Sequence, residues 1–228
     1  MQVVEPFQLV KFKSSVLAQQ CEKIGEQILN YQKYIDPIGL IKSNMGGWQS
    51  KFDMSNGAPT FPFFDEWSNY LFHLLQVYYA DYIETFYEKQ FIGKRKNDQS
   101  WTTNAWININ WPGDYNREHL HLPPDADEFY YIPPEIKKER NFWLPAASGS
   151  FYITDSHNTF FVSKNSTTKT TYISDGYIVK EKEREYIDFN AGDFWIGHSG
   201  LVHGVSENKQ NVPRISMSFN IEPTLEFK

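Results

Sequence analysis

The sequence predicts a mainly β protein, a barrel or sandwich of short strands with two helices packed on one outer face. Many short segments separated by turn residues follow Gly93, and this pattern indicates strands rather than helices. Two amphipathic stripes before Gly93 indicate the helices. Aromatic residues make up 17% of the 228 residues, which suits a β-rich core with large side chains between its layers.

The first hundred residues carry the helical pattern. An extended segment at Leu9–Lys13 precedes Ser14, which can cap a helix that ends near Tyr34. The apolar stripe of this helix comprises Leu17, Cys21, Ile24, Ile28 and Tyr31. A second helix is expected from Asp65 to about Tyr87. The turn-rich segment 44–50 is expected to be a loop.

The remainder of the chain is expected to form the barrel. Segment 105–111 alternates, with Asn108 and Asn110 on a polar face. Further strands are expected at 128–132, 149–154, 159–162, 170–173, 177–180, 186–188, 194–196, 201–205 and 213–221. Residues 123–145 contain five prolines and indicate an inserted loop at the barrel mouth. We therefore expect one domain over 1–228, with a helical elaboration at 1–100 and the barrel core at 101–228.

The net charge and the cysteine content argue against some classes of function and favour others. The formal net charge is −6, and the basic run at 94–96 is too short to follow a phosphate backbone, which argues against a nucleic-acid surface. The single cysteine, Cys21, excludes an intrachain disulfide framework and suits a reducing compartment. The chain shows no signal-peptide pattern and no apolar run long enough to span a bilayer, so we expect a cytoplasmic protein. Oligomeric state is left open.

Three histidines form the candidate metal site. His119 and His121 are two residues apart on an expected strand, so both side chains can point to the same face. His203, in the segment 192–203, is the expected distal ligand. By contrast, His157 is expected in a turn at the surface, and His198 in a structural turn near the barrel mouth.

Arg214 lies eleven residues after His203, in a segment that alternates between polar and apolar side chains. One face carries Arg214, Ser216, Ser218 and Asn220, and the other carries Ile215, Met217, Phe219 and Ile221. The apolar face can pack against the helices. A cationic face inside a barrel is costly unless it meets an anion, and a small dicarboxylate would satisfy it.

These motifs resemble the 2-oxoglutarate- and Fe(II)-dependent oxygenase superfamily, and among its members the phage and bacterial His-x-His subgroup. The resemblance is carried by Gly-Gly-Trp-Gln-Ser at 46–50, Trp106-x-Asn108, Gly-Asp before His-x-His, Ser148-Gly149-x-x-Tyr152, and His203 with Arg214-x-Ser216. It covers residues 44–228 and is strongest after Trp106. The subgroup pattern differs here at Leu122, before Pro123, and at Phe151, before Tyr152. The resemblance implies a double-stranded β-helix (jelly-roll, cupin-like) barrel, in the host cytoplasm if the protein is phage-encoded.

Carried over by position, the resemblance implies Fe(II) bound by His119 and His203 and 2-oxoglutarate held by Arg214 and Ser216. Tyr152 and Asn108 are the other residues expected to bind the cosubstrate. No catalytic residue is expected beyond the metal centre. His121 occupies the slot that usually holds a carboxylate. Two arrangements are open: three imidazoles bind the metal, or an acid supplies the third ligand. The candidate acids are Asp125, Asp127, Glu128 and Asp193.

The resemblance implies a dioxygenase that uses O₂ and 2-oxoglutarate to hydroxylate an unidentified prime substrate, with release of succinate and CO₂. Two alternatives remain. One is a cupin-type metal enzyme that does not use 2-oxoglutarate, because the paired histidine motifs and Glu128 also resemble cupin motifs. The other is a catalytically inactive barrel that serves as a binding or structural module.

Overall fold

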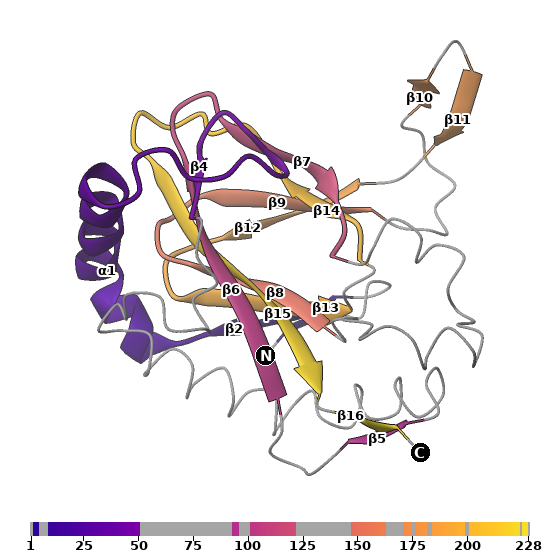
Figure 1. Cartoon of the computed structure of the whole chain (residues 1–228). Helices are drawn as coiled ribbons and strands as arrows, with labels where there is room; N and C mark the ends of the chain where they lie inside the picture. The colour runs from indigo at the N-terminus through magenta and orange to yellow at the C-terminus, as the bar shows by residue number, and fades with distance from the viewer. Residues whose placement is uncertain are drawn as a thin grey trace.

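The computed structural model shows a β-rich molecule with one long helix at its side (Figure 1). The structure describes residues 2–4, 9–50, 93–95, 101–121, 147–162, 171–174, 177–181, 184–198, 201–223 and 225–227. The expected second helix at 65–87, the loop at 123–145, and the acids Asp125, Asp127 and Glu128 lie outside these residues.

Two antiparallel sheets face one another and form the barrel. The major sheet has the order β1-β2-β13-β8-β15-β6-β4, and the minor sheet has the order β12-β9-β14-β7-β3. The strands of the major sheet are β1 (Gln2–Val4), β2 (Leu9–Lys13), β13 (Asp193–His198), β8 (Ala147–Tyr152), β15 (Arg214–Pro223), β6 (Trp101–Asn110) and β4 (Trp48–Gln49). Those of the minor sheet are β12 (Arg184–Phe189), β9 (His157–Val162), β14 (His203–Val205), β7 (Tyr115–His119) and β3 (Asn44–Met45). The arrangement is a double-stranded β-helix, as expected.

Two further pairs of strands stand apart from the barrel sheets. The hairpin of β10 (Thr171–Ser174) and β11 (Tyr177–Glu181) projects from one corner of the molecule, and β5 (Gly93–Arg95) pairs with β16 (Leu225–Phe227) (Figure 1). Neither pair contributes a strand to the two facing sheets.

Helix α1 (Ser15–Tyr34) covers the outer face of the major sheet. Ser14 caps the helix by accepting a hydrogen bond from the Leu17 amide, as expected. A Cβ placed on Gly25 would lie 3.6 Å from Ile215 Cδ1, so the middle of the helix packs directly on β15. Ile215, Met217 and Phe219 are buried on this face, which confirms the apolar side of the expected alternation.

The N-terminal region contributes more to the barrel than its helical pattern indicates. Strands β1 and β2 extend the major sheet, because β2 pairs with β13. The segment expected to be a loop at 44–50 instead contains β3 and β4, and each adds an edge strand to one sheet. The loop prediction was wrong because two-residue strands on either side of Gly46-Gly47 are too short to show an alternation. Their pairing partners, β7 and β6, lie far along the chain.

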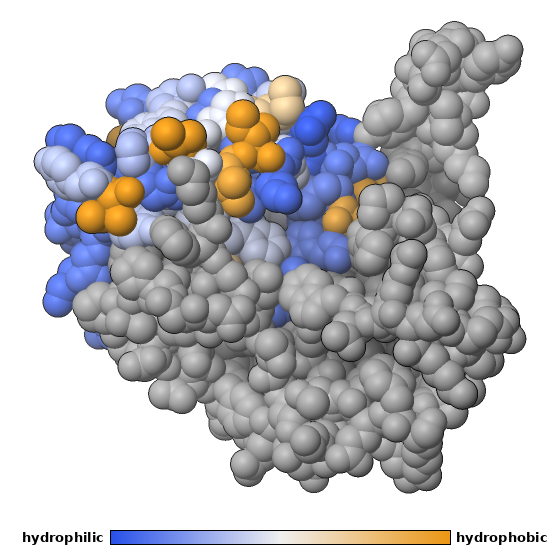
Figure 2. All heavy atoms as spheres, viewed as in Figure 1, coloured by the Kyte–Doolittle hydropathy of each residue, from blue (hydrophilic) through white to orange (hydrophobic). Residues whose placement is uncertain are grey.

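Several large hydrophobic side chains are exposed at the end of α1 and just after it. They are Tyr34, Ile35, Ile38, Leu40, Ile41 and Met45. Figure 2 shows hydrophobic groups, in orange, among the blue hydrophilic surface of the described part. In the portion of the chain that the structure describes, no helix combines the length and apolar character needed to cross a bilayer.

Candidate metal centre and anion chamber

The three predicted histidines meet at one end of the barrel. His119 closes β7, and its direct partner across the sheet is His203, the first residue of β14. His121 follows two residues after the end of β7. The ligating atoms of the three imidazoles lie within 4.8 Å of one another, and this group could hold a metal ion.

Hydrogen bonds orient each ring. The Nδ1 atom of His119 lies 2.7 Å from the Arg117 carbonyl oxygen, and Nδ1 of His203 lies 2.8 Å from the Leu201 carbonyl oxygen. A carbonyl oxygen can only accept, so Nδ1 carries the proton in both rings. The lone pair of each ring is therefore on Nε2, the atom that remains to bind a metal.

His121 is oriented from the opposite sheet. Its Nδ1 atom lies 2.6 Å from Oδ1 of Asn220 on β15. The half-buried Trp106 packs against it, with ring centroids 5.4 Å apart. His121 is thus held by two strands of the major sheet, β15 and β6, although it follows a strand of the minor sheet.

Burial keeps the three imidazoles neutral. It lowers the pKa of His119 and His121, the latter to about 3, and lowers that of His203 well below its usual value. Mutual repulsion adds to the effect, from His119 on His121 and from both on His203. Neutral imidazole is the form that binds a metal ion, so the ligands are ready at neutral pH.

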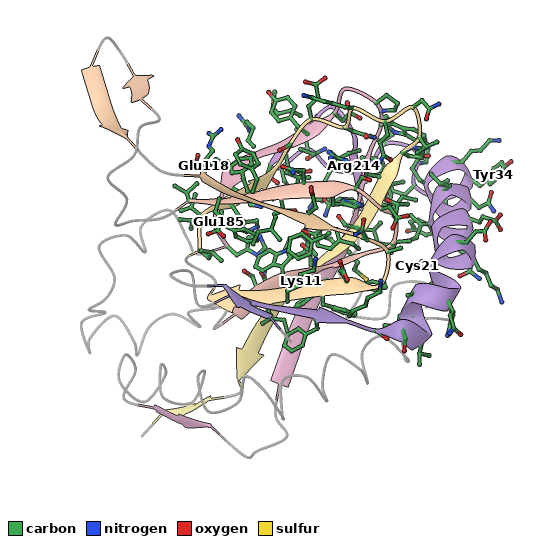
Figure 3. The ribbon with its side chains drawn as sticks, turned by 180° about the vertical axis from the view of Figure 1, so that it is seen from behind. Lys11, Cys21, Tyr34, Glu118, Glu185 and Arg214 are labelled. Atoms are coloured by element: carbon green, nitrogen blue, oxygen red, sulfur yellow. The ribbon has the colours of Figure 1, made fainter. Side chains whose placement is uncertain are left out.

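The inner face of the major sheet forms a polar chamber beside the histidines. The strand register places Arg214 opposite Asn110, Ser216 opposite Asn108 and Tyr152, Ser218 opposite Ser150, and Asn220 opposite Ser148. These side chains are buried or nearly so. Arg214 begins β15 on the side toward α1, whereas Glu118, next to His119, lies at the other end of the barrel (Figure 3).

Several polar atoms of this chamber have no hydrogen-bond partner among the residues that the structure describes. They are Nε of Arg214, Nδ2 of Asn110, Oδ1 of Asn108 and Oγ of Ser148. Leaving a buried polar group unpaired costs about 1–3 kcal/mol. Four unpaired polar atoms in one chamber therefore indicate that the chamber binds a polar ligand.

Arg214 is the charged group of the chamber. Its side chain is 2% exposed, and Nη2 donates to the Ser206 carbonyl oxygen. Burial lowers its pKa from the ordinary value, but a guanidinium remains protonated in proteins. Among the described residues, no carboxylate forms an ion pair with it. A buried cation of this kind fits a carboxylate supplied by a ligand.

Tyr152 lies between the chamber and the core. Its hydroxyl accepts a hydrogen bond from Trp195 Nε1 at 3.0 Å and shares a second with Thr159 Oγ1 at 2.6 Å. Because either hydroxyl can donate in the second bond, the phenol proton can turn toward a ligand when Thr159 donates. Asn108 donates to Ser218 through Nδ2, so its free Oδ1 faces the chamber as an acceptor.

Two residues behave differently from the sequence-based expectations. His157, expected at the surface, is 1% exposed, because it begins β9 with its ring tilted against that of Tyr152 inside the barrel, at 4.6 Å between ring centroids. Asp193 binds Lys11 Nζ at 3.1 Å and accepts from the Asn190 amide. It does not belong to the histidine group, so within the described residues the group consists of imidazoles alone.

Asn220 and Asn110 are site residues that the sequence left without a role. The alternation placed Asn220 on the polar face with Arg214, and Asn110 on the polar face with Asn108. The sequence therefore already showed two amides on faces that point into the barrel, where an amide is unexpected. Their roles could not be predicted, because they depend on the strand register that brings Asn220 to His121 and Asn110 to Arg214.

Comparisons with known proteins find similar folds among solved structures but no match by sequence. No protein-family model matches the chain, and no curated protein matches it by sequence. Among solved structures, a Pseudomonas putida prolyl-4-hydroxylase is similar over 96% of this chain and 94% of its own, with TM-score 0.54 and 12% identity. HygX from Streptomyces hygroscopicus, solved with nickel, 2-oxoglutarate and hygromycin B, is similar over 96% and 84%, with TM-score 0.53 and 10% identity. SnoK, a non-heme alpha-ketoglutarate-dependent carbocyclase from nogalamycin biosynthesis, covers 96% and 81%, with TM-score 0.53 and 10% identity. At these identities the likeness establishes the fold alone.

Proposed function

We propose that this protein is an Fe(II)- and 2-oxoglutarate-dependent dioxygenase that hydroxylates an unidentified substrate. The observation that carries the proposal is the pairing of three neutral imidazoles with a buried Arg214 that has no ion pair among the described residues. The first group suits a divalent metal, and the second suits the far carboxylate of a dicarboxylate. The oxygenases with the same fold, including one solved with nickel and 2-oxoglutarate, support this reading.

Bound Fe(II) and 2-oxoglutarate would supply the oxidising chemistry, in which R–H, O₂ and 2-oxoglutarate give R–OH, succinate and CO₂. One oxygen atom enters the product and the other enters succinate. His119, His121 and His203 would present their Nε2 lone pairs to the metal. Because all three ligands are neutral, the site would retain the full charge of the ion and favour an anionic cosubstrate.

The chamber residues would hold the cosubstrate. Arg214 Nε and Asn110 Nδ2, both buried donors without a partner in the described part of the chain, would donate to its distal carboxylate. Ser216, the inner-face neighbour of Asn108, would add a hydroxyl. Tyr152 would contribute its phenol proton when Thr159 donates to it. The half-buried Trp106, beside His121, would line the approach of the prime substrate.

The cytoplasm suits the proposed chemistry, because a reducing compartment keeps iron in the ferrous state. We therefore retain the cytoplasm as the expected location, and the host cytoplasm if the chain is phage-encoded.

A metal enzyme of the same barrel that does not use 2-oxoglutarate is the second candidate. The absence of a carboxylate from the described histidine group favours it, because three imidazoles also suit metal sites outside the oxygenases. The two candidates differ at Arg214, which the second one does not need as an anion clamp.

Anaerobic titration with Fe(II) and 2-oxoglutarate distinguishes the two candidates. The oxygenase should develop a visible charge-transfer band that requires both additions, and His203→Ala should abolish it. Arg214→Ala should raise the 2-oxoglutarate concentration needed for half the band at least tenfold, because a charge-assisted contact is lost. Lys23→Ala, which removes a positive charge from an exposed side chain of α1, is the matched control. Metal binding without a band, and no effect of Arg214→Ala, would instead support the second candidate.

A further inference from the structure

His121 is positioned differently from its two neighbours. The rings of His119 and His203 donate to the carbonyl of the residue two positions earlier, so the local backbone orients them. His121 lies beyond the end of β7, and its Nδ1 partner is a side chain 99 residues away in the chain. The third imidazole therefore depends on a contact between the two sheets.

We propose that Asn220 is a positioning residue that makes His121 the third metal ligand, in the slot where a carboxylate is expected. The inference rests on the metal centre of the proposed function and is independent of 2-oxoglutarate. Asn220 Oδ1 accepts the Nδ1 proton at 2.6 Å, which leaves the lone pair on Nε2 and turns that atom toward His119 and His203.

The surroundings of Asn220 make it a rigid acceptor. It is 7% exposed, and β15 is paired on both sides there, with Asn104 of β6 and Ser148 of β8 opposite. The His121 ring is also in contact with Trp106 on the neighbouring strand. The ring is thus held along its edge by an amide and beside an indole, which restricts its rotation.

The chemical identity of the acceptor also matters. An aspartate at this position would carry a charge and draw the ring proton toward itself, which would make the imidazole a stronger donor to the metal. An amide oxygen accepts the same hydrogen bond without adding charge. Asn220 therefore orients His121 while leaving the described ligand set neutral.

Metal affinity measures this role without requiring activity. We expect Asn220→Ala to weaken Ni(II) binding in calorimetry by 10- to 100-fold, the range found when the hydrogen-bond partner of a ligating histidine is removed. Asn220→Asp, which restores the acceptor, should return affinity to within about threefold of wild type or better. Asn158→Ala, on the outer face of β9, is the matched control and should leave affinity unchanged.

A double-mutant comparison separates positioning from general structural support. If Asn220 acts through His121, Asn220→Ala should have no further effect on Ni(II) affinity in a His121→Ala background. The absorption spectrum of the Co(II) form should change in the same way in Asn220→Ala and His121→Ala, since both would replace an imidazole by water. Asn220→Ser, whose hydroxyl is too short to reach the ring, serves the same comparison if the alanine variant does not fold.

The outcomes distinguish this inference from the proposed function. Wild-type protein that fails to bind Ni(II) or Co(II) would overturn the metal centre itself. Wild-type protein that binds metal while Asn220→Ala binds equally well would overturn the role of Asn220 alone. An equal loss from Asn220→Ala with and without His121 would show a structural effect, and would also overturn it.

Discussion

The ring of His157 lies inside the barrel, outside the metal group, and is held between neutral partners. The Thr154 hydroxyl accepts from the Ile215 amide and forms a second hydrogen bond with His157 Nε2, at 2.9 Å, in which either atom can donate. Burial, with a further contribution from the Arg214 charge, lowers the pKa of His157 well below its usual value. The neutral ring therefore supports the start of β15, from which Arg214 projects.

His157 should make the protein less stable in mild acid. Its pKa is lowered in the folded state, so below about pH 6.5 the unfolded chain binds a proton that the native chain excludes. The free energy of unfolding should then fall by up to about 1.4 kcal/mol per pH unit for this one group. Replacing His157 by Gln should remove that share of the slope between pH 6.5 and 5. Urea unfolding of the metal-free protein at several pH values measures it, and parallel pH profiles for the two proteins would contradict the assignment.

At the scale of elements, two glycines on the outer side of the major sheet have opposite requirements. Gly25 of α1 faces Ile215 and Ile153 at ordinary contact distance, so a methyl group fits there. Gly149 of β8 is enclosed, because its added Cβ would collide with the Trp195 carbonyl oxygen and come 2.6 Å from Phe219 Cζ. An added methyl group therefore fits between the helix and the sheet at Gly25, but it does not fit within the sheet at Gly149.

The same substitution should therefore have opposite effects at these two glycines. Gly25→Ala should raise the free energy of unfolding by about 0.5–1 kcal/mol, because alanine is the better helix former. Gly149→Ala should lower it by about 1–3 kcal/mol through overpacking against backbone. Denaturant unfolding of both variants measures the pair. A neutral Gly149→Ala would mean that β8 and β13 separate more easily than their close packing indicates.

The elements differ in how far the sequence could predict them. Helix α1 and strand β15 were predicted nearly to their ends, because a cap at Ser14 and a long alternation are local signals. Strands β3 and β4 were missed because they exist only through pairing with β7 and β6. His157 was misplaced for a similar reason, since a turn-like neighbourhood says nothing about which sheet a ring will face. His119 and His121 were paired by their spacing, and His203 was added from the distal segment 192–203 and the family resemblance. The contact of His121 with Asn220 depends on how the two sheets face each other.

For the whole molecule, the metal site lies where the two facing sheets meet. His119 and His203 belong to paired strands of the minor sheet, and His121 is bound to β15 of the major sheet. A metal ion bound by all three would therefore link the sheets. Without a metal, this end of the barrel holds three neutral imidazoles whose Nε2 atoms converge.

Metal binding should accordingly raise the thermal stability of the whole barrel. An ion that binds the native protein at 100 times its dissociation constant stabilises it by about 2.7 kcal/mol, which for a chain of this length corresponds to about 5–10 °C in Tm. Thermal unfolding followed by circular dichroism, with Ni(II) and then with excess chelator, should show the rise and its reversal. His119→Ala and His203→Ala should abolish the rise, whereas His157→Gln, outside the group, should keep it. A rise that persists in both alanine variants would place the ion elsewhere and would remove the link between the sheets.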